Sequence, residues 1–207
     1  MKPIRIIGLT GQTGAGKSTV SRMFASNGFE VIDCDEVCHE VLREEKQLIA
    51  ELALEFGVGI LDVDGNLNRR RLGAIVFNDR YRLDRLNRII FPYIGKRVMH
   101  MVSQLQKRGC GIVVLDAPTL FESGLDAECD EIVSVIAPVD LRLNRIMVRD
   151  HLTDTEARSR IASQHDDAFY TERSTYTLNN DSDYTTLRLA TLAVVEQLRH
   201  GKAAQKA

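Results

Sequence analysis

Short apolar runs alternate along the chain with segments in which apolar residues recur every three or four positions. The runs that have the length of strands cover residues 4–10, 29–32, 112–115, 132–137 and 174–178. Short runs of this kind, bounded by turn residues, are typical of strands in a parallel sheet that is covered on both faces. Because helical patterns separate them, the sequence predicts an α/β fold with a parallel five-stranded sheet flanked by helices.

The pattern is helical from about residue 37 to 108, which predicts a helical insert between the second and third strands. One helix of this insert is expected to stop at Gly57, and Asn68 is placed to cap the next one. We expect Phe91-Pro92 to interrupt the helix that follows, because proline lacks the backbone N–H that a helix interior uses. A last long helix of the insert then covers about 93–108.

Two further helices are expected between the fourth and fifth strands. The first covers about 140–149, and Thr153-Asp154-Thr155-Glu156 has the pattern of a capping box that opens the second, which extends to about Gln164. Two short helices joined by a tight link, basic on one side, can close over a triphosphate as a lid, and an ordinary surface hairpin is the alternative. The arginines of the first helix are Arg142, Arg145 and Arg149.

A last helix after the fifth strand completes the pattern. Its apolar face is marked by Leu187, Ala190, Val194 and Leu198, and Gly201 is expected to stop it. The tail beyond that glycine is rich in alanine, lysine and glutamine, so we expect it to fray.

The first strand runs directly into Gly11-Gln12-Thr13-Gly14-Ala15-Gly16-Lys17-Ser18, which matches the P-loop pattern G-x-x-x-x-G-K-[ST] at every required position. A strand before the motif and a helix after it form the context in which such a loop binds phosphate through backbone N–H groups and the helix dipole. In this motif Lys17 reaches the β- and γ-phosphates, and the hydroxyl of Ser18 binds Mg²⁺. A chance match is the alternative, and the strand–helix context argues against it.

Carboxylates follow two of the expected strands. Asp33 and Asp35 come after the second strand, and Asp116 comes after the third. Ligands of open α/β sheets bind at the carboxyl ends of the strands, so Asp33 and Asp35 are expected near the mouth of the P-loop. Asp116 resembles the carboxylate that assists Mg²⁺ in P-loop enzymes. Asp33 or Asp35 could instead cap the next helix, and alternation along a strand predicts that the two point in different directions.

Composition narrows the class of protein. The chain has 207 residues, of which 44% are hydrophobic and 27% charged, which fits one globular domain with an inserted lobe. A net charge of −2 argues against nucleic acid or a membrane surface as a partner. The apolar N-terminal stretch is read as a core strand rather than a signal peptide, so a cytoplasmic location is expected. The cysteines are expected to be buried thiols, with a zinc site at Cys34, Cys38 and His39 as the less favoured alternative.

Basic residues crowd locally in the helical insert although the whole chain is nearly balanced in charge. Most of them are expected to be solvated or to form ion pairs of small worth. A minority could line a site for a second anionic ligand. The candidates are Arg69, Arg70, Arg71, Arg80, Arg82, Arg85, Arg88, Lys96 and Arg97.

The absence of an Asn-Lys-x-Asp motif argues against a GTPase, and the absence of a Leu-Ser-Gly-Gly-Gln-type signature argues against a transporter ATPase. Sequence blocks along nearly the whole chain resemble the dephospho-CoA kinase family. They are Ile7–Gly11 with Gly14–Thr19, Val31–Asp35, Leu115–Leu125, Arg145–Asp150, Ile161–Gln164 and Asn179-Asn180. The chain departs from the family pattern at Phe91-Pro92, where the family usually has His-Pro, and at Cys34 and Thr119.

The resemblance implies ATP-dependent phosphorylation of the ribose 3′-hydroxyl of dephospho-CoA, with Asp35 as the base and with Lys17 and Arg145 as catalytic cations. Mg²⁺ is expected on Ser18, with Asp116 or Asp33 as a further ligand. A shikimate- or gluconate-type kinase and a non-catalytic nucleotide-binding regulator are the alternatives. The residues expected to hold ATP are Gly14, Ala15, Gly16, Lys17, Ser18, Thr19, Arg145 and Arg149.

The resemblance also implies a P-loop kinase fold with three parts. The nucleotide-binding core is expected over about 1–36, 109–140 and 166–207. A helical insert that binds the acceptor covers about 37–108, and a lid covers about 141–165. We expect a monomer or a weak homo-oligomer that acts on a small-molecule substrate.

Overall fold

The computed structural model describes residues 3–77 and 79–200. The chain divides into two compact units, and the first combines the stretch up to Val31 with the stretch from Gly109 onward. The second unit is the continuous stretch Ile32–Arg108. The expected helix stop at Gly201 and the tail after it lie outside the described residues.

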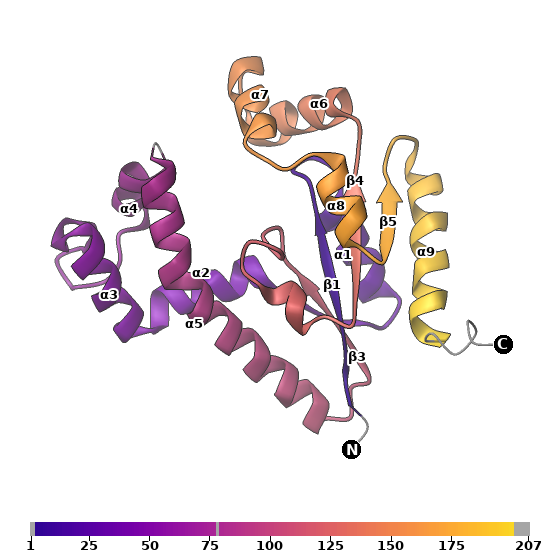
Figure 1. Ribbon diagram of the computed structural model, residues 1–207, viewed down its shortest axis with the longest axis horizontal. Helices are drawn as coiled ribbons and strands as arrows, with labels where there is room; N and C mark the ends of the chain where they lie inside the picture. The colour runs from indigo at the N-terminus through magenta and orange to yellow at the C-terminus, as the bar shows by residue number, and fades with distance from the viewer. Residues whose placement is uncertain (1–2, 78, 201–207) are drawn as a thin grey trace. The chain divides into compact units, whose positions relative to one another are not determined.

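A five-stranded sheet forms the centre of the first unit, and its strands lie in the order β2-β3-β1-β4-β5 (Figure 1). The pairings of β1 with β3, β1 with β4 and β4 with β5 are all parallel, as predicted. The strands are β1 (Arg5–Gly11), β2 (Glu30–Asp33), β3 (Ile112–Asp116), β4 (Glu131–Ile136) and β5 (Tyr176–Asn179).

The strand order places β1 in the middle of the sheet. Leu9 of β1 pairs with Asp116 of β3, and Gly11 of β1 pairs with Val135 of β4. The carboxyl ends of these three strands therefore meet where the glycine-rich loop begins. At the opposite edge, buried Glu131 accepts hydrogen bonds from Arg5 and from the hydroxyl of Tyr176, which ties three strands together.

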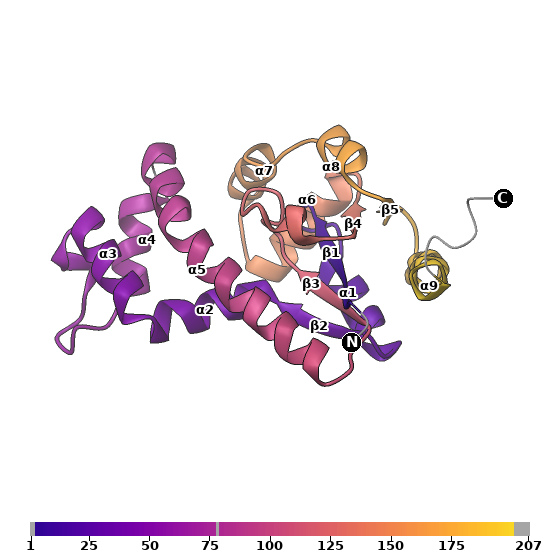
Figure 2. The same ribbon diagram turned by 60° about the horizontal axis from the view of Figure 1, so that its bottom comes forward.

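Helices cover both faces of the sheet (Figures 1 and 2). The helices α1 (Lys17–Ser26) and α9 (Tyr184–His200) contact each other and cover one face, and α8 (Asp167–Arg173) contacts β4 and β5 from the other. The short helix η2 (Leu125–Glu128) follows β3. The core between the sheet, α1 and α9 is apolar, with Phe24, Ile7, Leu9 and Leu198 fully buried.

The two helices expected between the fourth and fifth strands are present as α6 (Val139–Asp150) and α7 (Asp154–Ala162). Thr153 and Glu156 form the predicted capping box at the start of α7. The two helices pack together through a small cluster of their own, built on Leu143, Ile146 and Ala157. Such a small cluster stabilises the hairpin less than the main core stabilises the sheet.

The second unit is helical, as predicted. Its elements are α2 (Cys34–Glu44), α3 (Lys46–Phe56), η1 (Val58–Ile60), α4 (Arg69–Val76) and α5 (Arg80–Lys107). Asn68 caps α4 by accepting a hydrogen bond from the N–H of Arg71, and α3 ends at Gly57. Both boundaries were expected from the sequence.

The prediction that Phe91-Pro92 interrupts a helix is wrong, because α5 continues through Pro92. A proline inside a helix costs about 3 kcal/mol. The buried residues of α5 recur every four positions on both sides of it: Leu86, Ile90, Ile94, Val98 and Val102. Burying a large apolar side chain stabilises by about 1.5–3 kcal/mol, so this face outweighs the cost of the proline. Pro92 is exposed and Phe91 is half-buried.

The sequence patterns did not predict helix α8. It has fewer than eight residues, too few to show a helical period, and it begins at a cap in which Asp166 accepts a hydrogen bond from the N–H of Phe169. Across residues 3–77 and 79–200, the structure contains no helix with the length and apolar character that crossing a bilayer requires.

Candidate active site

The glycine-rich loop turns sharply between β1 and α1. At Gly11, where φ is 152°, a Cβ atom would lie 2.3 Å from the carbonyl oxygen of Val135, so only glycine allows the loop to leave the sheet this closely. Gly16 has φ 104° and precedes α1, whose first turn carries no acidic residue. Within the described residues no side chain caps α1. The N–H groups at the start of this helix therefore suit an anion.

Lys17 and Asp116 form an ion pair at the carboxyl edge of the sheet. Lys17 Nζ donates a hydrogen bond to Asp116 Oδ1, and the two side chains are 15% and 8% exposed. Asp116 is the last residue of β3 and lies beside Leu9 of β1, which explains why it reaches the loop. The ion pair places Asp116 beside the glycine-rich loop.

Arg145 of α6 contacts the loop from the side of its carbonyl groups. Arg145 Nη1 donates to the carbonyl oxygen of Gly14 at 3.2 Å. Arg145 Nη2 lies 3.5 Å from both the backbone oxygen and Oδ1 of Asn180. Asn180 Nδ2 in turn donates to the carbonyl oxygen of Ala15 at 2.7 Å. The structure thus places Arg145 beside Gly14 and Ala15, which the sequence had assigned to the same site.

Side chains at the end of the lid and just after it also hold the loop. Gln164 Oε1 accepts a hydrogen bond from the N–H of Thr13 at 2.8 Å. Buried Gln12 donates through Nε2 to Asp167 Oδ1 at 2.8 Å. The sequence did not assign Gln12 or Asp167 a part in this site. The only signal was their polarity, which an exposed loop residue shares.

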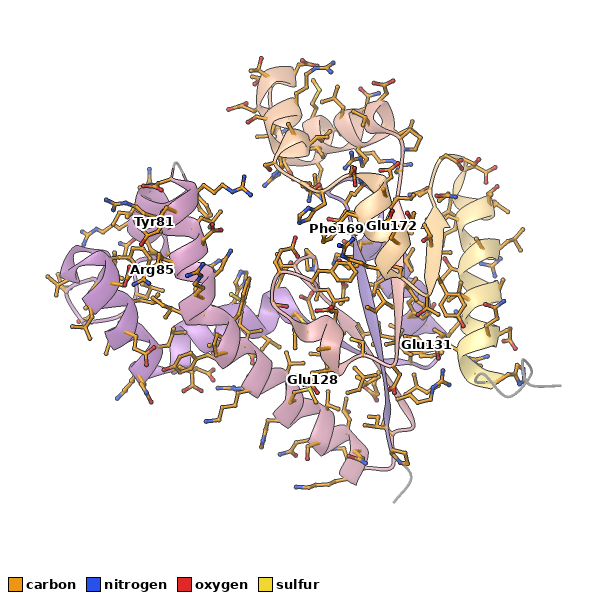
Figure 3. The ribbon with its side chains drawn as sticks, viewed as in Figure 1. Tyr81, Arg85, Glu128, Glu131, Phe169 and Glu172 are labelled. Carbon is orange, nitrogen blue, oxygen red and sulfur yellow. The ribbon has the colours of Figure 1, made fainter. Side chains whose placement is uncertain are left out.

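The ring of Phe169 on α8 packs beside these contacts (Figure 3). His165 stacks on it with the ring centroids 3.7 Å apart, and the guanidinium of Arg173 lies 4.2 Å from its centroid. Phe121 meets it edge-on at 5.3 Å. This aromatic group fixes the segment that carries Asp167 and Gln164.

The arginines of α6 occupy different environments. Arg142 is 3% exposed, and its Nε and Nη1 atoms have no hydrogen-bond partner among the described residues. Burial lowers the pKa of Arg142, and the charge of Asp167 and the Tyr170 hydroxyl act in the opposite direction. Because it is buried, Arg142 does not belong to a solvent-facing basic surface of the lid.

Arg149 is exposed and bonds its neighbour Asp150 through two N–H groups, at 2.7 and 2.8 Å. Asp150 also accepts a hydrogen bond from Arg160 of α7. The hydrogen bond from Arg149 is the largest of several effects that lower the pKa of Asp150 to about 2. In this conformation Arg149 belongs to an ion-pair cluster of the lid.

Ser18 and Thr19 lie in the first turn of α1, and Ser18 is exposed. A hydroxyl at Ser18 and a carboxylate at Asp116 are both oxygen donors, which Mg²⁺ prefers. Mg²⁺ usually keeps several waters and binds one or two protein groups together with substrate phosphates, so this small donor set fits it. Among the described residues no group of three or more His, Cys, Asp or Glu side chains is arranged to hold a metal by itself.

Asp33 and Asp35 belong to the second unit. Asp33 caps α2, because its Oδ1 accepts hydrogen bonds from the N–H groups of Asp35 at 2.9 Å and Glu36 at 3.1 Å. Asp35 lies in the first turn of α2 rather than on the strand. Alternation along a strand would place residues 33 and 35 on the same face, so it gave no ground for expecting them to point apart. Of the two, Asp33 is the cap of α2.

The basic residues of the second unit differ in their partners. Arg97 lies against a group of carboxylates, with Nη2 at 3.0 Å from Glu45 Oε1 and Nη1 at 3.3 Å from Glu44 Oε2. Arg85, labelled with Tyr81 in Figure 3, bonds both oxygens of Glu55. These two arginines hold helices together.

Arg69 and Arg88 are both exposed, and they do not share that arrangement. Arg69 Nη2 lies 2.9 Å from His39 Nε2, which is not an acidic partner. For Arg88 no ion pair is found within the described residues. These two side chains therefore fit an external anion better than Arg85 and Arg97 do.

Comparisons with known proteins point in one direction. A family model described as dephospho-CoA kinase matches residues 5–186 of the chain. A dephospho-CoA kinase of Geobacillus kaustophilus is 38% identical over 191 residues, which cover 92% of this chain and 95% of that protein.

Solved structures agree with the sequence comparisons. A protein from Thermus thermophilus has a TM-score of 0.79 and 31% identity, covering 95% of this chain and 99% of that one. A dephospho-CoA kinase from Campylobacter jejuni has a TM-score of 0.70 and 26% identity, covering 95% of this chain and 98% of that one. The likeness therefore extends over almost the whole length of each chain.

Proposed function

The chain belongs to the dephospho-CoA kinase family, and we propose that it transfers the γ-phosphoryl group of ATP to the ribose 3′-hydroxyl of dephospho-CoA. The observation that supports this most directly is the glycine-rich loop that leads into the uncapped start of α1, with Lys17 and Asp116 paired beside it. Phosphoryl transfer depends on positioning and on neutralising charge rather than on a covalent intermediate. The site supplies both.

We assign the triphosphate to the residues from Gly14 to Thr19. The N–H groups of the loop and of the first turn of α1 hold the phosphate oxygens, and the ammonium of Lys17 exchanges Asp116 for the phosphates. This exchange costs little, because the ammonium keeps an anionic partner throughout. Mg²⁺, which Ser18 and Asp116 would hold, neutralises charge that develops on the phosphates.

We assign the cations of the lid to the same reaction. Arg145 already contacts the loop at Gly14 and has five N–H donors, more than its present contacts use. It can therefore stabilise charge on the transferred phosphoryl group when the lid excludes water. Arg149 requires a larger change, since it must first leave Asp150.

We assign the acceptor to the second unit. We assign the base to Asp35, which lies in the first turn of α2 and matches the second aspartate of the family's segment; it orients the ribose hydroxyl and accepts its proton, whereas Asp33 caps the helix. Dephospho-CoA carries a pyrophosphate, which the exposed guanidinium groups of Arg69 and Arg88 can bind. The helical insert then determines the acceptor, and the first unit determines the donor.

A coupled ADP-release assay tests the proposed reaction. The purified protein is given ATP and Mg²⁺ with dephospho-CoA, with adenosine or with shikimate. Of the three acceptors, we expect only dephospho-CoA to cause ADP release. Mass spectrometry should then show a product that carries one added phosphate on the ribose. Release with shikimate but not with dephospho-CoA would overturn the assignment of the acceptor. Binding of ATP with no turnover of any acceptor would favour a regulator.

A further inference from the structure

Asn180 connects the sheet, the lid and the glycine-rich loop. It directly follows β5, is 8% exposed, and its backbone N–H donates to the carbonyl oxygen of Ile136 at 2.9 Å. Its side chain extends from this fixed backbone to the loop, where Nδ2 donates to the carbonyl oxygen of Ala15 at 2.7 Å. Asn180 belongs to the asparagine pair that the sequence set apart, but the roles assigned above do not use it.

The bond to Ala15 determines the direction of a neighbouring N–H group. A peptide unit is planar and trans, so its carbonyl oxygen and the N–H of the next residue point in opposite directions. Because the carbonyl group of Ala15 points toward Asn180, the N–H of Gly16 points away from Asn180. Gly16 directly precedes α1, where N–H groups suit an anion.

The contact between Asn180 and the loop is too close for any residue but glycine at position 16. A Cβ atom built on Gly16 would lie 2.4 Å from Asn180 Nδ2, and the φ of 104° at Gly16 would strain any other residue. The last glycine of the motif is thus explained by the side chain of Asn180 as well as by the turn.

Arg145 determines which way round the amide of Asn180 lies. Asn180 Oδ1 faces Arg145 Nη2 at 3.5 Å, so Nδ2 faces Ala15. If the amide were flipped, Oδ1 would face the carbonyl oxygen of Ala15 and Nδ2 would face the N–H groups of Arg145. We propose that Asn180 is a positioning residue for the phosphoryl donor, which fixes the Ala15–Gly16 peptide so that the N–H of Gly16 faces the triphosphate.

The proposal rests on the proposed ATP site and is tested with Asn180→Asp, compared with Asn179→Asp as the matched control. Asn179 is the neighbouring residue, has the same side chain and is exposed at the end of β5. In Asn180→Asp the oxygen that faces Arg145 is kept, but an ionised carboxylate cannot donate to Ala15. We expect the Kd for ATP to rise roughly 10- to 100-fold in Asn180→Asp, because a buried carbonyl loses its donor. Asn179→Asp should bind ATP as the wild type does.

Protonation provides a second readout that a merely structural role would not produce. A protonated aspartate regains an O–H donor toward Ala15, so the ATP affinity of Asn180→Asp should recover relative to the wild type as the pH falls from neutral to mildly acidic. Arg145 faces residue 180 and opposes this protonation, so the recovery should be partial. Affinity is measured by isothermal titration calorimetry, which does not depend on turnover.

The outcomes separate this proposal from the proposed function. Equal ATP affinity in the two variants at neutral pH would overturn the role of Asn180. Should Asn180→Asp fail to fold by circular dichroism, Asn180→Ser offers a shorter hydroxyl donor and should bind ATP more tightly than Asn180→Ala; equal affinity of these two would overturn the role as well. A wild type that binds ATP but does not phosphorylate dephospho-CoA would contradict the function and leave the role of Asn180 in place.

Discussion

The side chains of Arg142, Arg145 and Arg149 repeat every three or four residues along α6, yet they meet different surroundings. Arg142 is buried, Arg145 is half-buried beside the loop, and Arg149 is exposed and donates hydrogen bonds to Asp150. Helical spacing gives the face of a residue but not how deep that face is buried. Arg142 lies beside Gly14 through its backbone, whereas Arg145 reaches the loop through its guanidinium, and Arg145 is the arginine that we assign to transition-state charge.

Replacing Lys17 should separate catalysis from stability. Lys17→Ala removes the ammonium that meets the phosphates, so kcat should fall by at least about 10³-fold, since a positioned cation supplies several kcal/mol to phosphoryl transfer. It also leaves the buried carboxylate of Asp116 without its partner, so the melting temperature should fall. In Lys17→Ala with Asp116→Asn the melting temperature should recover, but kcat should not. A recovery of kcat would show that Lys17 acts only as the partner of Asp116.

Replacement of Asp33 and replacement of Asp35 should differ in their effect. Asp35→Asn keeps the shape and removes the base, so kcat should fall roughly 10²- to 10⁴-fold while the Kd for ATP stays near the wild-type value. Asp33→Asn keeps a capping oxygen, because asparagine caps helices about as well as aspartate, so stability and kcat should change little. Steady-state kinetics and calorimetry on both variants provide the comparison. A dead Asp33→Asn beside an active Asp35→Asn would reverse the assignment.

At the scale of helices and strands, the sequence correctly predicted those helix boundaries that are determined by a few neighbouring residues. The capping box at Thr153, the cap at Asn68 and the stop at Gly57 are each determined by hydrogen bonds or dihedral angles within a few residues. The prediction of a helix break at Pro92 was wrong because distant residues, rather than neighbouring ones, determine whether α5 continues. The helix α5 continues through Pro92 because its apolar face packs against α2 and α3, which lie tens of residues earlier in the sequence, and against the preceding helix α4.

The candidate site shows the same division between local and distant causes. The P-loop pattern predicted the residues that contact phosphate, because the loop forms from consecutive residues. The residues that hold the loop in place, Gln164, Asp167 and Asn180, come from segments more distant in sequence and meet it only in the folded chain. The resemblance to the family marked Gln164 and Asn180 as parts of shared blocks, but only the folded chain shows that their side chains bond the loop, and nothing in the sequence marked Asp167.

Charge reversal in the helical insert should divide its arginines into two groups. Arg69→Glu and Arg88→Glu should raise the KM for dephospho-CoA roughly 10-fold or more, since each loses an exposed cation assigned to the acceptor. The KM for ATP should stay nearly the same. Arg97→Glu is the control with the same change of charge, and it should lower the melting temperature because it places a carboxylate among Glu40, Glu44 and Glu45. An unchanged KM for dephospho-CoA in the first two variants would show that those arginines are merely solvated.

At the scale of the whole molecule, two groups, the hydroxyl of Tyr170 and the thiol of Cys129, should make the protein less stable at alkaline pH. Burial raises the pKa of Tyr170 to about 12, and burial also raises the pKa of the Cys129 thiol to about 12. The folded state therefore holds these protons more tightly than the unfolded chain does. Their contribution to stability is complete below the ordinary pKa of each group and is lost as the pH rises toward the folded value.

Tyr170→Phe tests this linkage, because it keeps the ring that packs against Phe121 and Phe169. The unfolding free energy should decline less between about pH 10 and pH 12 in this variant than in the wild type, by at most about 2–3 kcal/mol. Tyr184→Phe removes a hydroxyl from a residue that is 63% exposed, so its decline should match the wild type. Urea titrations across this pH range measure the difference. Identical declines for all three proteins would show that the proton of Tyr170 does not contribute.

The position of β1 in the middle of the sheet has a consequence for how the chain is made. A ribosome releases β1 early, but β3 and β4, its neighbours in the sheet, come from beyond Arg108. The continuous second unit can fold while β1 still waits for them, since domains tend to fold as units during synthesis. Asn180 and α9 leave the ribosome after β3 and β4. If Asn180 sets the loop as proposed, a nascent chain binds ATP at full strength only after residue 180 has joined the sheet.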